Sequence, residues 1–163
     1  MARKADPQIE QLSFALDRSF TSKGWHGPTL LGSLRGISAR QALATPGGIK
    51  HPIWQLVRHA AYWKYAACVR IGAMAPDTFR YSPSNWPTVP ATPDEKVWAG
   101  ERAYLKKLHA TLIAALSAMD ASALDRIPSG GRSVSVRRLI TGVAAHDAYH
   151  TGQIQLIKGL LKR

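Results

Sequence analysis

The sequence has one cysteine, Cys68, among its 163 residues and no long apolar run. A single cysteine excludes an intrachain disulfide and suits a reducing compartment. A membrane-spanning helix needs ~20 mostly apolar residues in a row, and the N-terminal MARKADPQIE has no apolar core of the kind a secretory signal contains. The length fits one domain. We therefore expect a cytoplasmic protein without a membrane partner, folded as a single domain over residues 1–163.

Acidic residues are also scarce. The chain carries 10 Asp and Glu against 22 Lys and Arg, a formal net charge of +12. Such a charge attracts nucleic acids and anionic substrates without regard to sequence. The basic residues are scattered, however, and no run of five or six, zinc-finger spacing or RNA-binding aromatic motif is present. A generally basic solvated surface is the favoured interpretation, and nucleic-acid binding stays open beside it.

Several cofactor motifs are missing as well. No G-x-G-x-x-G or Walker sequence occurs, so nucleotide-dependent chemistry has no support. The three glutamates, Glu10, Glu95 and Glu101, never stand in a Glu-x-x-His pair. A di-iron carboxylate site of the kind found in helical bundles uses such pairs. The sequence therefore argues against that chemistry.

What the sequence does have is apolar residues at helical spacing, with no convincing strand alternation. Asp6 is the expected N-cap of the first long helix, and Thr92 with Glu95 is the expected capping box of the third. Ser38 and Gln41 form a second capping box, in one of the short helical pieces that we expect between the first and second long helices. The long helices are expected at about residues 7–24, 51–74, 93–119 and 133–160.

These elements predict an all-α fold, a four-helix bundle. The connection between the second and third long helices, APDTFRYSPSNWPTVPATP, is rich in proline and has no helical period. It is too long for a tight hairpin and long enough to travel the length of a bundle. We therefore expect a crossover there, with the second and third helices parallel and an up-down-down-up order.

Histidines occupy unusual positions in the last helix, LITGVAAHDAYHTGQIQLIKGLL. His146 and His150 fall in the middle of the apolar stripe that we expect to face the core. The i, i+4 spacing lets two imidazoles converge on one metal ion. A third ligand is needed, and His59 lies between Leu56 and Trp63 on the stripe of the second long helix. Three neutral imidazoles would leave a fourth position for water or substrate, as in catalytic zinc sites.

The alternative is structural, because a lone histidine on an apolar face is usually a core residue hydrogen-bonded to a neighbour. Three such histidines are harder to explain in this way, since each needs its own buried partner. Cys68 lies about 180° around the helix from His59, and we interpret it as a packing residue. Asp147 takes the place of the glutamate in H-E-x-x-H. It is a candidate general base or a partner that orients an imidazole, and an exposed helix residue is the favoured interpretation.

The motifs HPIWQLVRHAAYW and HDAYHTGQIQLIKGLL together resemble the DinB/YfiT-like superfamily of metal-dependent enzymes. The segments GWHGPTLLGSLRGISARQAL and W…TPDEKVW also fit, so the resemblance covers nearly the whole chain. It implies a four-helix bundle with the long crossover, zinc or nickel on His59, His146 and His150, and a homodimer. Gly152 and Gln153 match as well, and Gln153 has two open interpretations: support for a ligand or bound water, or packing.

The function that follows is a metal-dependent enzyme acting on a small molecule. A metal with an open position lowers the pKa of bound water toward ~7, polarises a carbonyl or binds a thiolate. The resemblance implies a thiol-dependent S-transferase or isomerase using a low-molecular-weight thiol, and a hydrolase is chemically as accessible. The alternative is a non-catalytic, basic DNA-associated or stress-response binding protein. The aromatic residues Trp63, Tyr149 and Trp25 either line a pocket near the open position or pack in the core. His26 either lines the pocket with them or ends a turn.

Overall fold

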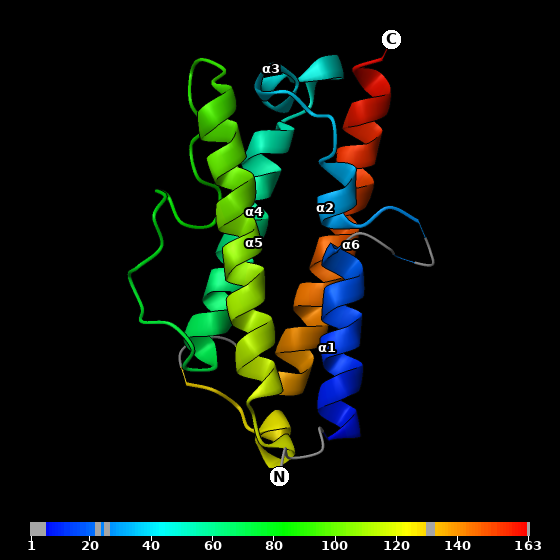
Figure 1. Ribbon diagram of the computed structural model, residues 1–163. Coiled ribbons are helices and arrows are strands. Elements are labelled where there is room, and N and C mark those ends of the chain that lie inside the picture. The colour runs from blue at the N-terminus through cyan, green and yellow to red at the C-terminus, as the bar shows by residue number, and fades with distance from the viewer. Residues whose placement is uncertain (1–5, 22–23, 25–26, 130–132, 163) are drawn as a thin grey trace.

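The computed structural model describes residues 6–21, 24, 27–129 and 133–162 (Figure 1). These residues form helices and no β-strand, apart from an isolated bridge between Gly24 and Gly27. The predicted all-α class is confirmed. In chain order the elements are α1 (Pro7–Phe20), α2 (Leu30–Ser33), α3 (Ala39–Leu43), the 3-10 turn η1 (Pro46–Gly48), α4 (Ile53–Arg70), α5 (Glu95–Ser117), the 3-10 turn η2 (Ala121–Asp125) and α6 (Val136–Leu160).

Two of the predicted helix caps are present. The Asp6 side chain accepts a hydrogen bond from the Gln8 amide at the start of α1. Ser38 and Gln41 form the reciprocal capping box of α3. In each case a short polar side chain satisfies backbone N–H groups that the first helical turn leaves without partners.

The predicted cap of α5 is wrong by two residues. Asp94, not Thr92, is the N-cap, and its carboxylate accepts a hydrogen bond from the Val97 amide at 2.9 Å. Glu95 does not reach back to close a capping box. Its carboxylate instead accepts from the Ala39 amide at 2.7 Å, which ties the start of α5 to α3. Glu95 thus makes a tertiary contact with α3 instead of the local capping contact that the sequence pattern predicted.

The long helices pack in pairs. α4 contacts α5, α1 contacts α6, and the pairs join where α4 meets α6 and α1 meets α5. In Figure 1 the colour advances upward along α1 and α6 and downward along α4 and α5. Residues 71–94 connect the lower end of α4 to the upper end of α5 along the outside of the molecule. No helix in the described part of the chain is long and apolar enough to cross a membrane.

A buried carboxylate fastens residues 71–94, here called the crossing segment, to the helices. Glu101 of α5 is 2% exposed and accepts hydrogen bonds from Trp54 Nε1 at 3.2 Å and Arg58 Nε at 3.1 Å. The Tyr81 hydroxyl of the crossing segment donates to the same carboxylate. Arg58 also donates to the Thr88 carbonyl. Glu101 therefore joins α4, α5 and the crossing segment through one charged group.

Replacing Glu101 with alanine is expected to lower the free energy of unfolding by about 3 to 5 kcal/mol, because removing one partner leaves Arg58 as an uncompensated charge in a largely buried site. Urea denaturation followed by circular dichroism measures the change. Glu10→Ala, an exposed position on α1, is the matched control and should fall within about 0.5 kcal/mol of the wild type. A loss below about 1 kcal/mol for Glu101→Ala would contradict this role.

Candidate metal centre

The three predicted histidines come together between α4 and α6. His146 Nε2 lies 3.1 Å from His59 Nε2 and 3.0 Å from His150 Nε2. One ligand atom from each ring lies within 4.8 Å of the others, a spacing that allows them to hold one metal ion. His59 is 5% exposed and His150 2%, whereas His146 is half-buried. The cluster is therefore inside the molecule and reachable on the His146 side.

Hydrogen bonds set the proton positions on two of the rings. His59 Nδ1 lies 2.6 Å from the Asn85 carbonyl oxygen, and His150 Nδ1 lies 2.6 Å from Gln153 Oε1. Because these oxygens only accept, each Nδ1 carries the proton and donates it. In the neutral rings the Nε2 atoms of His59 and His150 are then bare acceptors that point at His146. Metal-binding histidines are oriented in this way.

His146 cannot satisfy both neighbours. A neutral imidazole has one N–H, so His146 Nε2 donates to His59 or to His150 but not to both. Its Nδ1 atom is buried and has no hydrogen-bond partner among the residues that the structure describes. An excess of lone pairs converging within about 3 Å costs free energy unless a cation is shared between them. The arrangement is therefore one that could hold a metal ion, and the three rings are not all satisfied as core histidines.

The histidines are also held in the uncharged form that binds metals. Burial, followed by the neighbouring His150 and His59, lowers the pKa of His146 to about 3. Burial likewise lowers the pKa of His150 to about 4, against the opposing hydrogen bond to Gln153. The pKa of His59 is lowered by burial too, with the Asn85 hydrogen bond acting in the opposite direction. All three rings are therefore neutral at pH 7 and available as ligands.

The crossing segment supplies contacts that the sequence did not predict. Asn85 orients His59 through its carbonyl group, and Trp86 stacks on the His59 ring with centroids 3.7 Å apart and planes 6° apart. Trp86 also stacks on His51 at 4.0 Å. A lone tryptophan within a polar, proline-rich segment was the signal for this contact. A backbone carbonyl leaves no signal in the sequence.

Asp147 is not the exposed residue that we favoured from the sequence. It is fully buried, and its carboxylate accepts a hydrogen bond from Lys64 Nζ, which is fully buried too. Lys64 Nζ also lies 3.3 Å from His109 Nδ1. Burial raises the pKa of Asp147 and lowers that of Lys64, and the attraction between them opposes both shifts. Asp147 is thus part of an internal ion pair between α6 and α4.

The core-facing stripe of α6 is rotated from the predicted one. The buried side chains include Ile140, Asp147 and Ile154, whereas Leu139 and Gln153 are half-buried. His146 consequently lies at the edge of the stripe, not in its middle. The reason is that α6 has apolar residues on two overlapping faces, and Lys64 provides the partner that lets a carboxylate take a core position.

The other residues that the sequence singled out have different surroundings in the structure. Cys68 is buried, its thiol donates to the Leu108 carbonyl at 3.9 Å, and burial raises its pKa to about 11, so it packs as a neutral thiol. Tyr149 is exposed and accepts from Gln153 Nε2 at 3.2 Å, which leaves Gln153 Oε1 directed at His150. The aromatic candidate Trp25 and its neighbour His26 lie outside the described residues.

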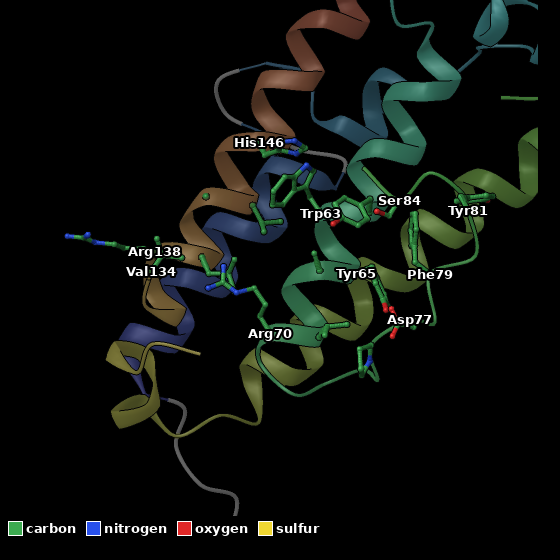
Figure 2. A pocket seen from close by; sticks show the side chains of 17 residues that line it. Trp63, Tyr65, Arg70, Asp77, Phe79, Tyr81, Ser84, Val134, Arg138 and His146 are labelled. Atoms are coloured by element: carbon green, nitrogen blue, oxygen red, sulfur yellow. The ribbon is translucent and has the colours of Figure 1, made fainter. Parts of the chain in front are cut away.

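A cavity of about 950 Å³ opens beside the histidines (Figure 2). Its walls come from α4, the crossing segment and α6. Trp63 and His146 both line it, so one of the three clustered rings faces the cavity. Cavities that bind small molecules have this order of volume.

Comparison with known proteins supports the resemblance. The family profile described as the DinB superfamily matches residues 24–154, which include the three clustered histidines. The chain therefore belongs to the DinB superfamily. Among curated proteins and solved structures, no match was found.

If the cluster holds a metal, Gln153→Ala should weaken zinc binding by about 10- to 100-fold, because His150 loses the acceptor that holds the proton on Nδ1. Competition with a chromophoric chelator measures the dissociation constant. Gln153→Glu keeps an acceptor and should retain most of the affinity. Gln155→Ala, on the same helix but outside the cluster, is the matched control. Unchanged affinity in Gln153→Ala would assign Gln153 to packing alone.

Proposed function

We propose that the protein is a metal-dependent enzyme that holds one divalent ion, zinc or nickel, on Nε2 of His59, His146 and His150. The observation that carries this proposal is the convergence of three neutral rings, two of them with their lone pairs fixed toward the centre. Three protein ligands leave a coordination position for water or substrate, as catalytic sites require. A bound metal there would lower the pKa of water toward ~7 or stabilise a thiolate.

The chain's own residues have distinct tasks in this proposal. The Asn85 carbonyl and the Gln153 side chain keep the protons on Nδ1, and Trp86 covers the outer face of His59. Asp147 is too deeply buried to reach a substrate and is already bound to Lys64. We therefore assign Asp147 a positioning role and not that of a general base.

The reaction class follows from the open position and the neighbouring cavity. We propose a small-molecule substrate and either S-transfer or isomerisation with a low-molecular-weight thiol, or hydrolysis. The proposal includes a cytoplasmic homodimer, each protomer a four-helix bundle in up-down-down-up order. The parallel course of α4 and α5 in Figure 1 supports that order.

Untagged protein purified without added metal is expected to contain about one zinc or nickel ion per chain, since three histidines complete one site. Plasma emission spectrometry measures the content. His150→Ala should reduce it to a small fraction while helicity is retained. His109→Gln, at a buried histidine outside the cluster, should keep its metal. A metal-free wild type whose stability does not change with chelator or added zinc would refute the proposal.

The high positive charge favours a second function, non-catalytic binding to DNA or a role as a basic stress-response binding protein. With a net charge of +12, affinity for duplex DNA should be measurable at low salt and fall steeply as salt rises, because binding releases counterions. Fluorescence anisotropy of a labelled duplex at about 50 and 200 mM salt tests this. Negligible binding at the lower concentration would leave the charge as surface composition only.

A further inference from the structure

The cavity beside the histidines has two chemically different ends. His146 and Trp63 lie at one end, and Arg70 and Arg138 line the other (Figure 2). In the figure Arg70 reaches from α4 toward α6, while Arg138 points outward at the rim. The cavity therefore has a candidate metal ligand at one end and positively charged side chains at the other.

Helix geometry gives the separation of these ends. Trp63 and Arg70 are seven residues apart on α4, and His146 and Arg138 are eight residues apart on α6. At 1.5 Å per residue, these intervals correspond to about 10 and 12 Å. The two helices run in opposite directions in Figure 1, so each places its arginine at the same end. The two estimates agree, so the ends lie about 10 to 12 Å apart along the helix axes.

The walls between the ends are mostly apolar. Phe79 of the crossing segment lies against two tyrosine rings of α4, with centroids 5.4 Å from Tyr62 and 5.3 Å from Tyr65. Leu139 and Val143 of α6 also line the cavity. Aromatic and aliphatic walls of this kind favour a planar, apolar ligand body.

The charge of the lining selects the sign of the ligand. Asp77 supplies the one carboxylate among the lining residues that the structure describes, against the two guanidinium groups of Arg70 and Arg138. Guanidinium groups bind carboxylates through paired, charge-assisted hydrogen bonds. A ligand with a carboxylate at one end and an apolar body toward His146 is therefore complementary to both charge and shape.

We propose that this cavity binds an elongated aromatic carboxylic acid, with its carboxylate at Arg70, at the end whose rim carries Arg138, and its opposite end at His146. The part of this assignment that concerns a reaction rests on the proposed function, because the end of the ligand at His146 would be the end that reacts. The binding site itself does not depend on the metal. The two parts can therefore be tested separately.

Three biphenyl probes of one shape and different charge test the assignment: 4-biphenylcarboxylate, 4-biphenylmethanol and 4-biphenylmethylamine. Isothermal titration calorimetry of the protein as purified should show saturable binding in the order carboxylate, alcohol, amine. The carboxylate should bind about tenfold more tightly than the alcohol, the effect of one charge-assisted interaction. Arg70→Met should remove most of that preference while leaving the alcohol's affinity unchanged.

Glycines on α6 provide a matched pair of variants that tests the location. A side chain added at Gly142, which lines the cavity, meets nothing within 4 Å of its Cβ, and the same holds for Gly159, which does not line it. Gly142→Phe should fill the cavity and weaken the binding of 4-biphenylcarboxylate by at least about tenfold, a loss of about 1.4 kcal/mol of binding free energy. Gly159→Phe should bind it like the wild type.

The outcomes separate this inference from the metal proposal. The His150→Ala variant should lose its metal and still bind 4-biphenylcarboxylate with the same dependence on Arg70. If this variant no longer binds the probe, the probe is a metal ligand only, and the cavity assignment is overturned. Equal binding of the amine and the carboxylate, or binding unaffected by Gly142→Phe, would overturn it too. A metal-free wild type that still binds the carboxylate, and whose stability does not change with added zinc, would refute the metal proposal alone.

Discussion

The buried ion pair between Lys64 and Asp147 is the constraint on which the geometry between α4 and α6 depends. Neither charge has access to water, so each can be buried only with the other in contact. Lys64 follows His59 by five residues on α4, and Asp147 follows His146 by one on α6. Any shift of one helix along the other would separate the charges and the imidazoles together. The pair therefore holds the two halves of the candidate metal centre in register.

A second buried carboxylate has a parallel task on the other side of α4. Glu101 binds Arg58 of α4 and Tyr81 of the crossing segment. That attachment holds the segment where Asn85 and Trp86 reach His59. One carboxylate thus fixes the helices that carry the histidines, and the other fixes the segment that orients one of them. Both are bound to cations, which is how an otherwise apolar core tolerates them.

The sequence predicted the elements better than their faces. Helical periodicity, the Asp6 cap and the spacing of His146 and His150 are local patterns, and they led to the all-α class and to the three histidines that the structure brings together. Local patterns could not predict which face of α6 turns toward the core, because the helix has two nearly equivalent apolar faces. Only the residues that pack against the helix decide between them. Asp147 became a core residue only because Lys64 lies opposite, a contact across 83 residues of chain. The Asn85 carbonyl is a backbone group, and any residue type would supply it.

The donor set explains why the cavity should favour anions. Three neutral imidazoles add no negative charge, so they would leave the double charge of a divalent ion uncompensated, unlike sites with carboxylate or thiolate ligands. The buried carboxylate that follows His146 in the sequence, Asp147, is already paired with Lys64. The arginines at the far end of the cavity carry charge of the same sign. If the cluster holds a metal ion, an anionic group would be favoured at either end, near the histidines and near Arg70. The excess of positive charge in the whole chain is thus also found in the lining of the cavity, in Arg70 and Arg138.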